Sequence, residues 1–77
     1  MGAKVSGLKI QFGKRLRILR KQAGLTQDQL AESINVSVET VSNMERGIHG
    51  PKFDTLEKIA NVMGLEVKTL FDFEALS

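Results

Sequence analysis

The sequence predicts a small all-α domain of five short helices. Apolar residues recur at helical spacing in five separate segments, and no segment of the 77 residues has the pattern of a β-strand. Glycine directly follows several of these segments, as is common where a helix ends. The apolar fraction of 42% excludes a disordered chain, and the length suits one domain with a single hydrophobic core.

The first helix is expected between Ile10 and Ala23, because apolar side chains repeat along one face there and Gly24 supplies a stop. Residues 1 to 8 precede this pattern and are expected to form a flexible segment, as chain ends commonly do. The predicted inner face of the helix consists of Phe12, Leu16, Leu19 and Ala23.

Residues 26 to 47, TQDQLAESINVSVETVSNMERG, predict two short helices that cross through a tight turn. Thr26 and Gln29 match a capping box for the first of them, and Ser37 can cap the second. Asn35 lies between them, where the chain needs a positive φ that asparagine tolerates. The predicted inward residues are Leu30, Ala31, Ile34, Val41 and Met44. Such a helix-turn-helix can place its second helix in the major groove of DNA.

A fourth helix is expected after the loop of residues 48 to 51. It would run from about Phe53 to Met63, and Gly64 would end it. The spacing of its apolar residues predicts an inner face of Phe53, Leu56, Ile59, Ala60 and Met63.

A fifth, short helix is expected from Glu66 to Phe71. It would bury Leu65, Phe71 and either Val67 or Leu70. Residues 72 to 77 have no clear period and form a tail, so the predicted helix-turn-helix domain covers residues 9 to 71.

The composition excludes several classes of protein. The chain has no cysteine and one histidine, so neither a disulfide framework nor a zinc cluster is expected. It lacks a glycine-rich phosphate loop and a nucleophile beside a base, so we expect no enzyme, no cofactor and no metal site. No apolar run reaches the length of a membrane span or resembles a signal peptide, which indicates a cytoplasmic protein without membrane contact.

Charge is distributed unevenly along the chain, although the net charge is only +2. All nine acidic residues follow residue 25, whereas every charged residue among the first 25 is a cation. A basic end of this kind attracts nucleic-acid phosphate, and the alternative is a solvated helix face that serves solubility. The cations are Lys4, Lys9, Lys14, Arg15, Arg17, Arg20 and Lys21.

Two stretches, RLRILRKQAGLTQDQLAESINVSVETVSNMERG and PKFDTLEKIANVMGL, resemble the helix-turn-helix domain of lambdoid phage repressors, Cro proteins and related bacterial regulators. The resemblance covers nearly all of residues 10 to 71. It departs from the family at Asn35, where glycine is usual, and at Lys52, where a small capping residue is common. It implies a compact five-helix, lambda-repressor-like fold. It also implies a sequence-specific transcriptional regulator that binds double-stranded DNA, and it favours a repressor.

The resemblance further implies which residues contact bases. The outward side chains of the second motif helix would meet base edges in the major groove, namely Val38, Glu39, Ser42 and Asn43. Val38 suits a thymine methyl group, Glu39 the N4 amino group of cytosine, and Asn43 adenine. The alternative for Glu39 is a favourable interaction with the helix N-terminus, and exposed serine is common in itself.

Phosphate contacts are implied at Gln27, Ser37, Thr40, Arg46 and Lys52. Family members hold a phosphate through the side-chain amide at the position of Gln27, and the alternative is an exposed polar residue with good helix propensity.

Two charged residues receive a structural role from the resemblance. Arg20 and Glu45 would form a partly buried ion pair that joins the first helix to the second motif helix. No other histidine, cysteine or acidic pair accompanies His49, so no role is assigned to it.

One domain of this size contacts only about four to six base pairs, so a homodimer on an inverted repeat is expected. Phe73 and Leu76 are the predicted dimer contacts, because the tail would otherwise expose apolar surface. The alternative function is a protein-binding module of the same fold, such as an antitoxin or an adaptor, that grips a partner protein.

Overall fold

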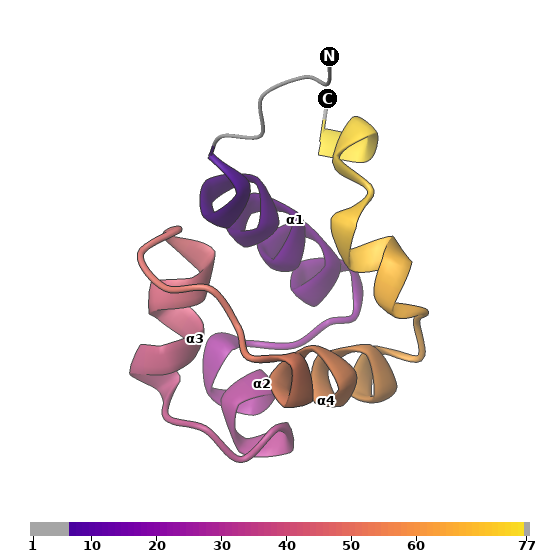
Figure 1. Cartoon of the computed structure of the whole chain (residues 1–77). Helices are drawn as coiled ribbons and strands as arrows, with labels where there is room; N and C mark the ends of the chain where they lie inside the picture. The colour runs from indigo at the N-terminus through magenta and orange to yellow at the C-terminus, as the bar shows by residue number, and fades with distance from the viewer. Residues whose placement is uncertain (1–6, 77) are drawn as a thin grey trace.

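The computed structural model describes the backbone of residues 7–76 and the side chains of residues 7–74. Helices are the only regular secondary structure in these residues, which confirms the predicted all-α class. The α-helices are α1 (Leu8–Gln22), α2 (Gln27–Ser33), α3 (Val38–Glu45) and α4 (Phe53–Met63), as Figure 1 shows. Two 3-10 helices follow, η1 (Val67–Phe71) and η2 (Phe73–Leu76). None of the helices in residues 7–76 is long and apolar enough to cross a membrane.

The prediction of a fifth α-helix is therefore wrong in type. The segment forms a single short 3-10 helix at η1, and the tail that had no clear period adds a second one at η2. Short pieces of this kind are typical of 3-10 structure, which rarely continues beyond a few residues. At the other end, residues 1–6 of the predicted flexible segment lie outside the described residues, and Leu8 already belongs to α1.

The core lies where α1 crosses the helix-turn-helix. Helix α1 contacts α3 on one side and both 3-10 helices on another, while α2 packs against α3 (Figure 1). Each α-helix contributes the face that its apolar spacing predicts, apart from residues at helix ends. The buried apolar residues are Phe12, Leu16, Leu19, Leu30, Ala31, Ile34, Val41, Met44, Leu56, Ile59, Ala60 and Leu70.

Local hydrogen bonds and one left-handed residue fix the starts of α2 and α3 and the turn between them, as the sequence predicts. Thr26 and Gln29 form the complete capping box, with bonds of 3.1 Å and 2.9 Å. Ser37 caps α3 through a bond from the Thr40 backbone N–H. Asn35 has a φ of 59°, so the left-handed turn conformation is confirmed.

Two apolar residues predicted to face inward are exposed instead. Phe53 is 86% exposed, and Ala23 lies at the surface just after α1 ends. Phe53 is the first residue of α4, and side chains tilt toward the N-terminus of their helix. Its ring is therefore not covered by the core that the later turns of α4 contact. Of the two alternatives in the fifth segment, Leu70 is the buried one.

The C-terminal 3-10 helices are tied to α1. The ring of Phe71 lies 5.4 Å from that of Phe12, and the ring of Phe73 lies 6.1 Å from that of Phe71. Arg15 is buried, and its Nε donates a hydrogen bond of 3.1 Å to the Thr69 carbonyl. Phe73 is thus partly buried within its own domain, and the Leu76 side chain lies outside the described part.

Candidate nucleic-acid interface

Helix α3 is held from below by its apolar face and by the backbone of α1. Val41 and Met44 are almost completely buried. Gly13 of α1 lies so close to the end of α3 that a Cβ there would sit 2.4 Å from the Met44 carbonyl oxygen and 2.7 Å from that of Glu45. Only glycine permits this approach, so the position of α3 relative to α1 is closely defined.

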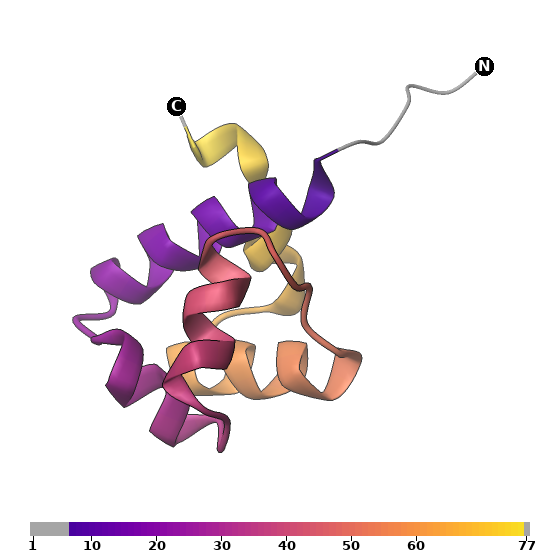
Figure 2. The ribbon, with the colours of Figure 1, turned by 90° about the vertical axis from the view of Figure 1, so that its left-hand side faces the viewer.

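The opposite face of α3 is accessible to a ligand. Val38 is 44% exposed, Glu39 is exposed, and Ser42 and Asn43 are half-buried at the base of this face. In Figure 2 α3 crosses the front of the molecule, in the face turned to the viewer. These four side chains are the ones for which base contacts were predicted.

The two hydroxyl residues at the start of α3 contact each other. The Ser37 Oγ and Thr40 Oγ1 atoms are 2.9 Å apart, and Ser37 also accepts the bond from the Thr40 N–H. Both residues are exposed. Their hydroxyl groups therefore form one small polar group beside the N-terminus of α3.

Glu45 joins three helices through its carboxylate. Arg20 Nε lies 2.5 Å from Glu45 Oε2, and Arg20 Nη2 donates to Oε1 at 3.0 Å, which makes the pair bidentate. Gln27 Nε2 donates to the same Oε1 at 3.0 Å. The side chains of Arg20 and Glu45 are 9% and 4% exposed. The structure thus joins α1, the start of α2 and the end of α3 at one shielded carboxylate.

A broad polar hollow lies between α3 and the α1–α2 corner. Its volume is about 620 Å³, and it is lined by Gln27, Val38, Ser42 and Arg46 together with the ion pair. Arg17 also lines it and is exposed, although the sequence pattern singled it out only as one of several cations. The sequence could have indicated its place, because Arg17 lies three residues before Arg20 and residues three apart share a helix face.

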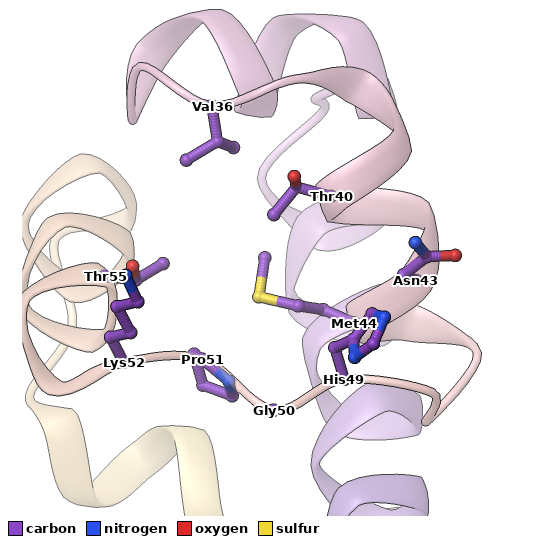
Figure 3. A pocket seen from close by; sticks show the side chains of 9 residues that line it. All are labelled: Val36, Thr40, Asn43, Met44, His49, Gly50, Pro51, Lys52 and Thr55. Atoms are coloured by element: carbon purple, nitrogen blue, oxygen red, sulfur yellow. The ribbon is translucent and has the colours of Figure 1, made fainter.

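A second hollow lies on the other side of α3, between that helix and the start of α4. Its volume is about 380 Å³, and Met44, Val36 and Thr40 point into it in Figure 3. Thr55 faces the hollow from α4, and Lys52 faces it from the residue just before α4. Asn43 and His49 lie at the edge of the hollow. His49 thus shares this hollow with three predicted contact residues, Thr40, Asn43 and Lys52.

The predicted site residues consequently gather around α3. Most of them line one of the two hollows, whereas Ser37 and Glu39 line neither. In the described part of the chain, no three His, Cys, Asp or Glu side chains lie close enough together to hold a metal ion. The geometry is that of an exposed helix flanked by two depressions, a polar one that contains Arg17 and Arg46 and a more apolar one with Lys52 among its lining residues.

Comparison with known proteins defines the class. A family model described as helix-turn-helix matches residues 16–70, which include all of α2, α3 and α4. The chain therefore belongs to the helix-turn-helix family of this model, and the resemblance to phage repressors and related regulators is confirmed.

Particular relatives are phage and bacterial regulators. The chain is 38% identical over 64 residues to the immunity repressor protein of Bacillus phage phi105, a match that covers 83% of this chain and 44% of that protein. It is 28% identical over 72 residues to the control protein C.BamHI of Bacillus amyloliquefaciens, with 92% and 89% covered.

A solved structure of a controller protein has the same fold. The restriction-modification controller protein C.AhdI from Aeromonas hydrophila is 33% identical and superposes with a TM-score of 0.78, covering 82% of this chain and 96% of that one. The chain spans about half the length of the first curated relatives that it matches and nearly all of the two controller proteins.

Proposed function

We propose that this protein is a sequence-specific transcriptional regulator, acting as a repressor, that inserts α3 into the major groove of double-stranded DNA. The observation that supports this most is the pair of hollows on either side of the exposed face of α3. The major groove admits one α-helix and is bordered by two phosphate backbones. A helix that enters it needs room for a backbone on each side, with cations within reach of each strand.

Phosphate contacts would fix the position of the domain on the duplex. Arg17 and Arg46 line one hollow and would meet one backbone, whereas Lys52 lines the other hollow and would meet the second backbone. Gln27 uses one amide hydrogen for Glu45 and keeps the second for a phosphate oxygen. The paired hydroxyl groups of Ser37 and Thr40 remain exposed for a further contact.

Base contacts would come from the exposed face of α3. Val38 offers a methyl surface to thymine, and Asn43 can bind adenine through two hydrogen bonds. Ser42 is small enough to allow close approach, while Glu39 can accept a hydrogen bond from the cytosine amino group. Because phosphates repel a carboxylate, we expect Glu39 to contribute more to discrimination between sequences than to affinity.

The regulator would act as a homodimer on an inverted repeat. One copy of α3 contacts too few base pairs to specify a unique site, and two copies related by two-fold symmetry double the number of base pairs contacted. The names of the relatives, an immunity repressor and two controller proteins, support a role in regulating transcription.

Selection of bound duplexes from a random pool tests this function. We expect enrichment of a palindromic consensus, and affinity for the selected duplex should fall steeply as salt rises. An Asn43→Ala variant should lose preference at one base position in each half-site, whereas Gln27→Ala should weaken binding to all duplexes alike. If no duplex is enriched or retarded at low salt, the proposal is wrong and a protein-binding module becomes the better explanation.

A further inference from the structure

An apolar groove lies between the first half of α1, the α3–α4 loop, the start of α4 and the end of η1. Its volume is about 210 Å³, and its apolar lining comes from Leu8, Phe12, Pro51, Phe53, Leu56 and Phe71. Leu8 is 45% exposed, and Phe53, at 86%, is the most exposed large apolar side chain in the described part of the chain. We call this surface the Phe53 groove.

We propose that the Phe53 groove is the contact surface for a second copy of this chain, with the Phe53 ring of each copy seated in the groove of the other. A two-fold axis requires one patch to be complementary to itself. The Phe53 groove meets this requirement, because a projecting ring and an apolar recess lie side by side on the same surface.

The position of the groove relative to α3 favours a second copy over another partner. Gly50 and Pro51 line both the Phe53 groove and the hollow beside α3, so the two surfaces are separated only by the α3–α4 loop. In Figure 2 this loop runs down the edge of the molecule next to α3 and ends at the start of α4. A copy docked across this edge can therefore present its own α3 toward the same side.

Phe73 of the tail is less suited to this contact than Phe53. Its ring packs edge-on against Phe71, so it already has a partner within the domain and is partly buried. Phe53 has no comparable packing and is four-fifths or more exposed. Our proposal therefore puts the dimer contact at Phe53 rather than at the predicted Phe73, while the side chain of Leu76, the other predicted contact, lies outside the described residues.

The size of the groove predicts a weak dimer in the absence of DNA. A buried Phe side chain removes about 150–250 Å² from water, so two Phe53 rings account for roughly 300–500 Å². With the groove walls added, the total buried area is still at or below ~1,200 Å², which is the lower limit for stable protein–protein interfaces. We expect dissociation in the micromolar range or weaker, and dimers that assemble cooperatively on an inverted repeat. This last expectation rests on the proposed function.

Two matched variants test the proposal by sedimentation equilibrium. Phe53→Gln removes the projecting ring, and Val62→Gln makes the same neutral change at an exposed apolar residue near the other end of α4. Neither variant changes the net charge, and the thermal melt of each checks that the fold is intact. Phe53→Gln should raise the dimer dissociation constant by about tenfold or more, whereas Val62→Gln should leave it within about twofold.

A DNA measurement separates this proposal from the proposed function. Using the selected consensus, Phe53→Gln should bind a duplex with one half-site as the wild type does, and it should lose cooperativity on the full inverted repeat. The proposal is overturned if Phe53→Gln dimerises and binds cooperatively like the wild type, or if the wild type is monomeric and non-cooperative throughout. The latter result is also the one expected if a different protein occupies the groove. If no variant binds DNA, the proposed function fails, and sedimentation alone decides the dimer contact.

Discussion

At the scale of single residues, the geometry of the interface depends most on Glu45. One carboxylate accepts hydrogen bonds from Arg20 on α1 and from Gln27 at the start of α2. Both members of the ion pair are almost fully shielded, so neither can be rehydrated if its partner is removed. The same carboxylate also fixes the amide that we propose as a phosphate donor.

Replacement of Glu45 by alanine should lower the free energy of unfolding by about 3 kcal/mol, because it leaves the Arg20 guanidinium shielded and without its carboxylate. Urea unfolding measures the change. Glu57→Ala, at an exposed position on α4, is the control and should stay within about 0.5 kcal/mol. The double variant Arg20→Ala with Glu45→Ala should lose less than the sum of the single changes, and strict additivity would contradict a coupled pair.

Sequence could suggest some of these residues and not others. The Arg20–Glu45 pair spans 25 positions, so no local spacing rule connects the two residues, and only the family resemblance pointed to it. The bond from Gln27 to Glu45 depends on the angle between α2 and α3, which no pattern in the sequence encodes. Arg17 resembled any solvated cation until the fold placed it beside Arg46.

At the scale of secondary structure, helix ends were predictable where a local hydrogen bond or a positive φ defines them. Thr26, Ser37 and Asn35 act within three or four residues, and each does what its chemistry indicates. Phe53 fits the apolar period of α4 equally well, but its burial depends on what lies beyond the first turn. The spacing of apolar residues in α4 contains no information about those neighbours, so the prediction of an inward Phe53 was wrong.

The crossing of α1 and α3 gives a test at this scale. Gly13→Ala should lower the free energy of unfolding by about 1–2 kcal/mol, because the added Cβ collides with two backbone carbonyl oxygens of α3. The gain in helix propensity, about 1 kcal/mol, offsets only part of this cost. Thermal or urea unfolding measures it, with Gln11→Ala on the exposed side of α1 as the control. A Gly13→Ala variant as stable as the wild type would show that α3 moves away from α1 at little cost.

At the scale of the whole molecule, the charges are arranged for one face rather than for high net charge. The net charge is +2, yet the broad hollow beside α3 contains Arg17 and Arg46, both exposed. Lys58 and Lys68 are also exposed but lie on α4 and η1, and neither lines the two hollows beside α3. The positions of the cations, rather than how many there are, should therefore govern DNA binding.

The salt dependence of binding tests this arrangement. The double variant Arg17→Ala with Arg46→Ala should reduce the slope of log affinity against log salt by about 1.8, since each lost phosphate contact removes about 0.9. Lys58→Ala with Lys68→Ala removes the same formal charge and should leave the slope nearly unchanged. Equal slopes for the two double variants would mean that only net charge matters and that Arg17 and Arg46 contact no phosphate.

The shared carboxylate of Glu45 and the close approach at Gly13 have a practical consequence for protein engineering. A peptide cut to residues 26–47 would keep the two motif helices but lose Arg20 and the α1 backbone beneath α3. Grafting that peptide into another scaffold would consequently transfer the side chains that face DNA without the angle at which they are presented. The smallest transplantable unit must begin with α1.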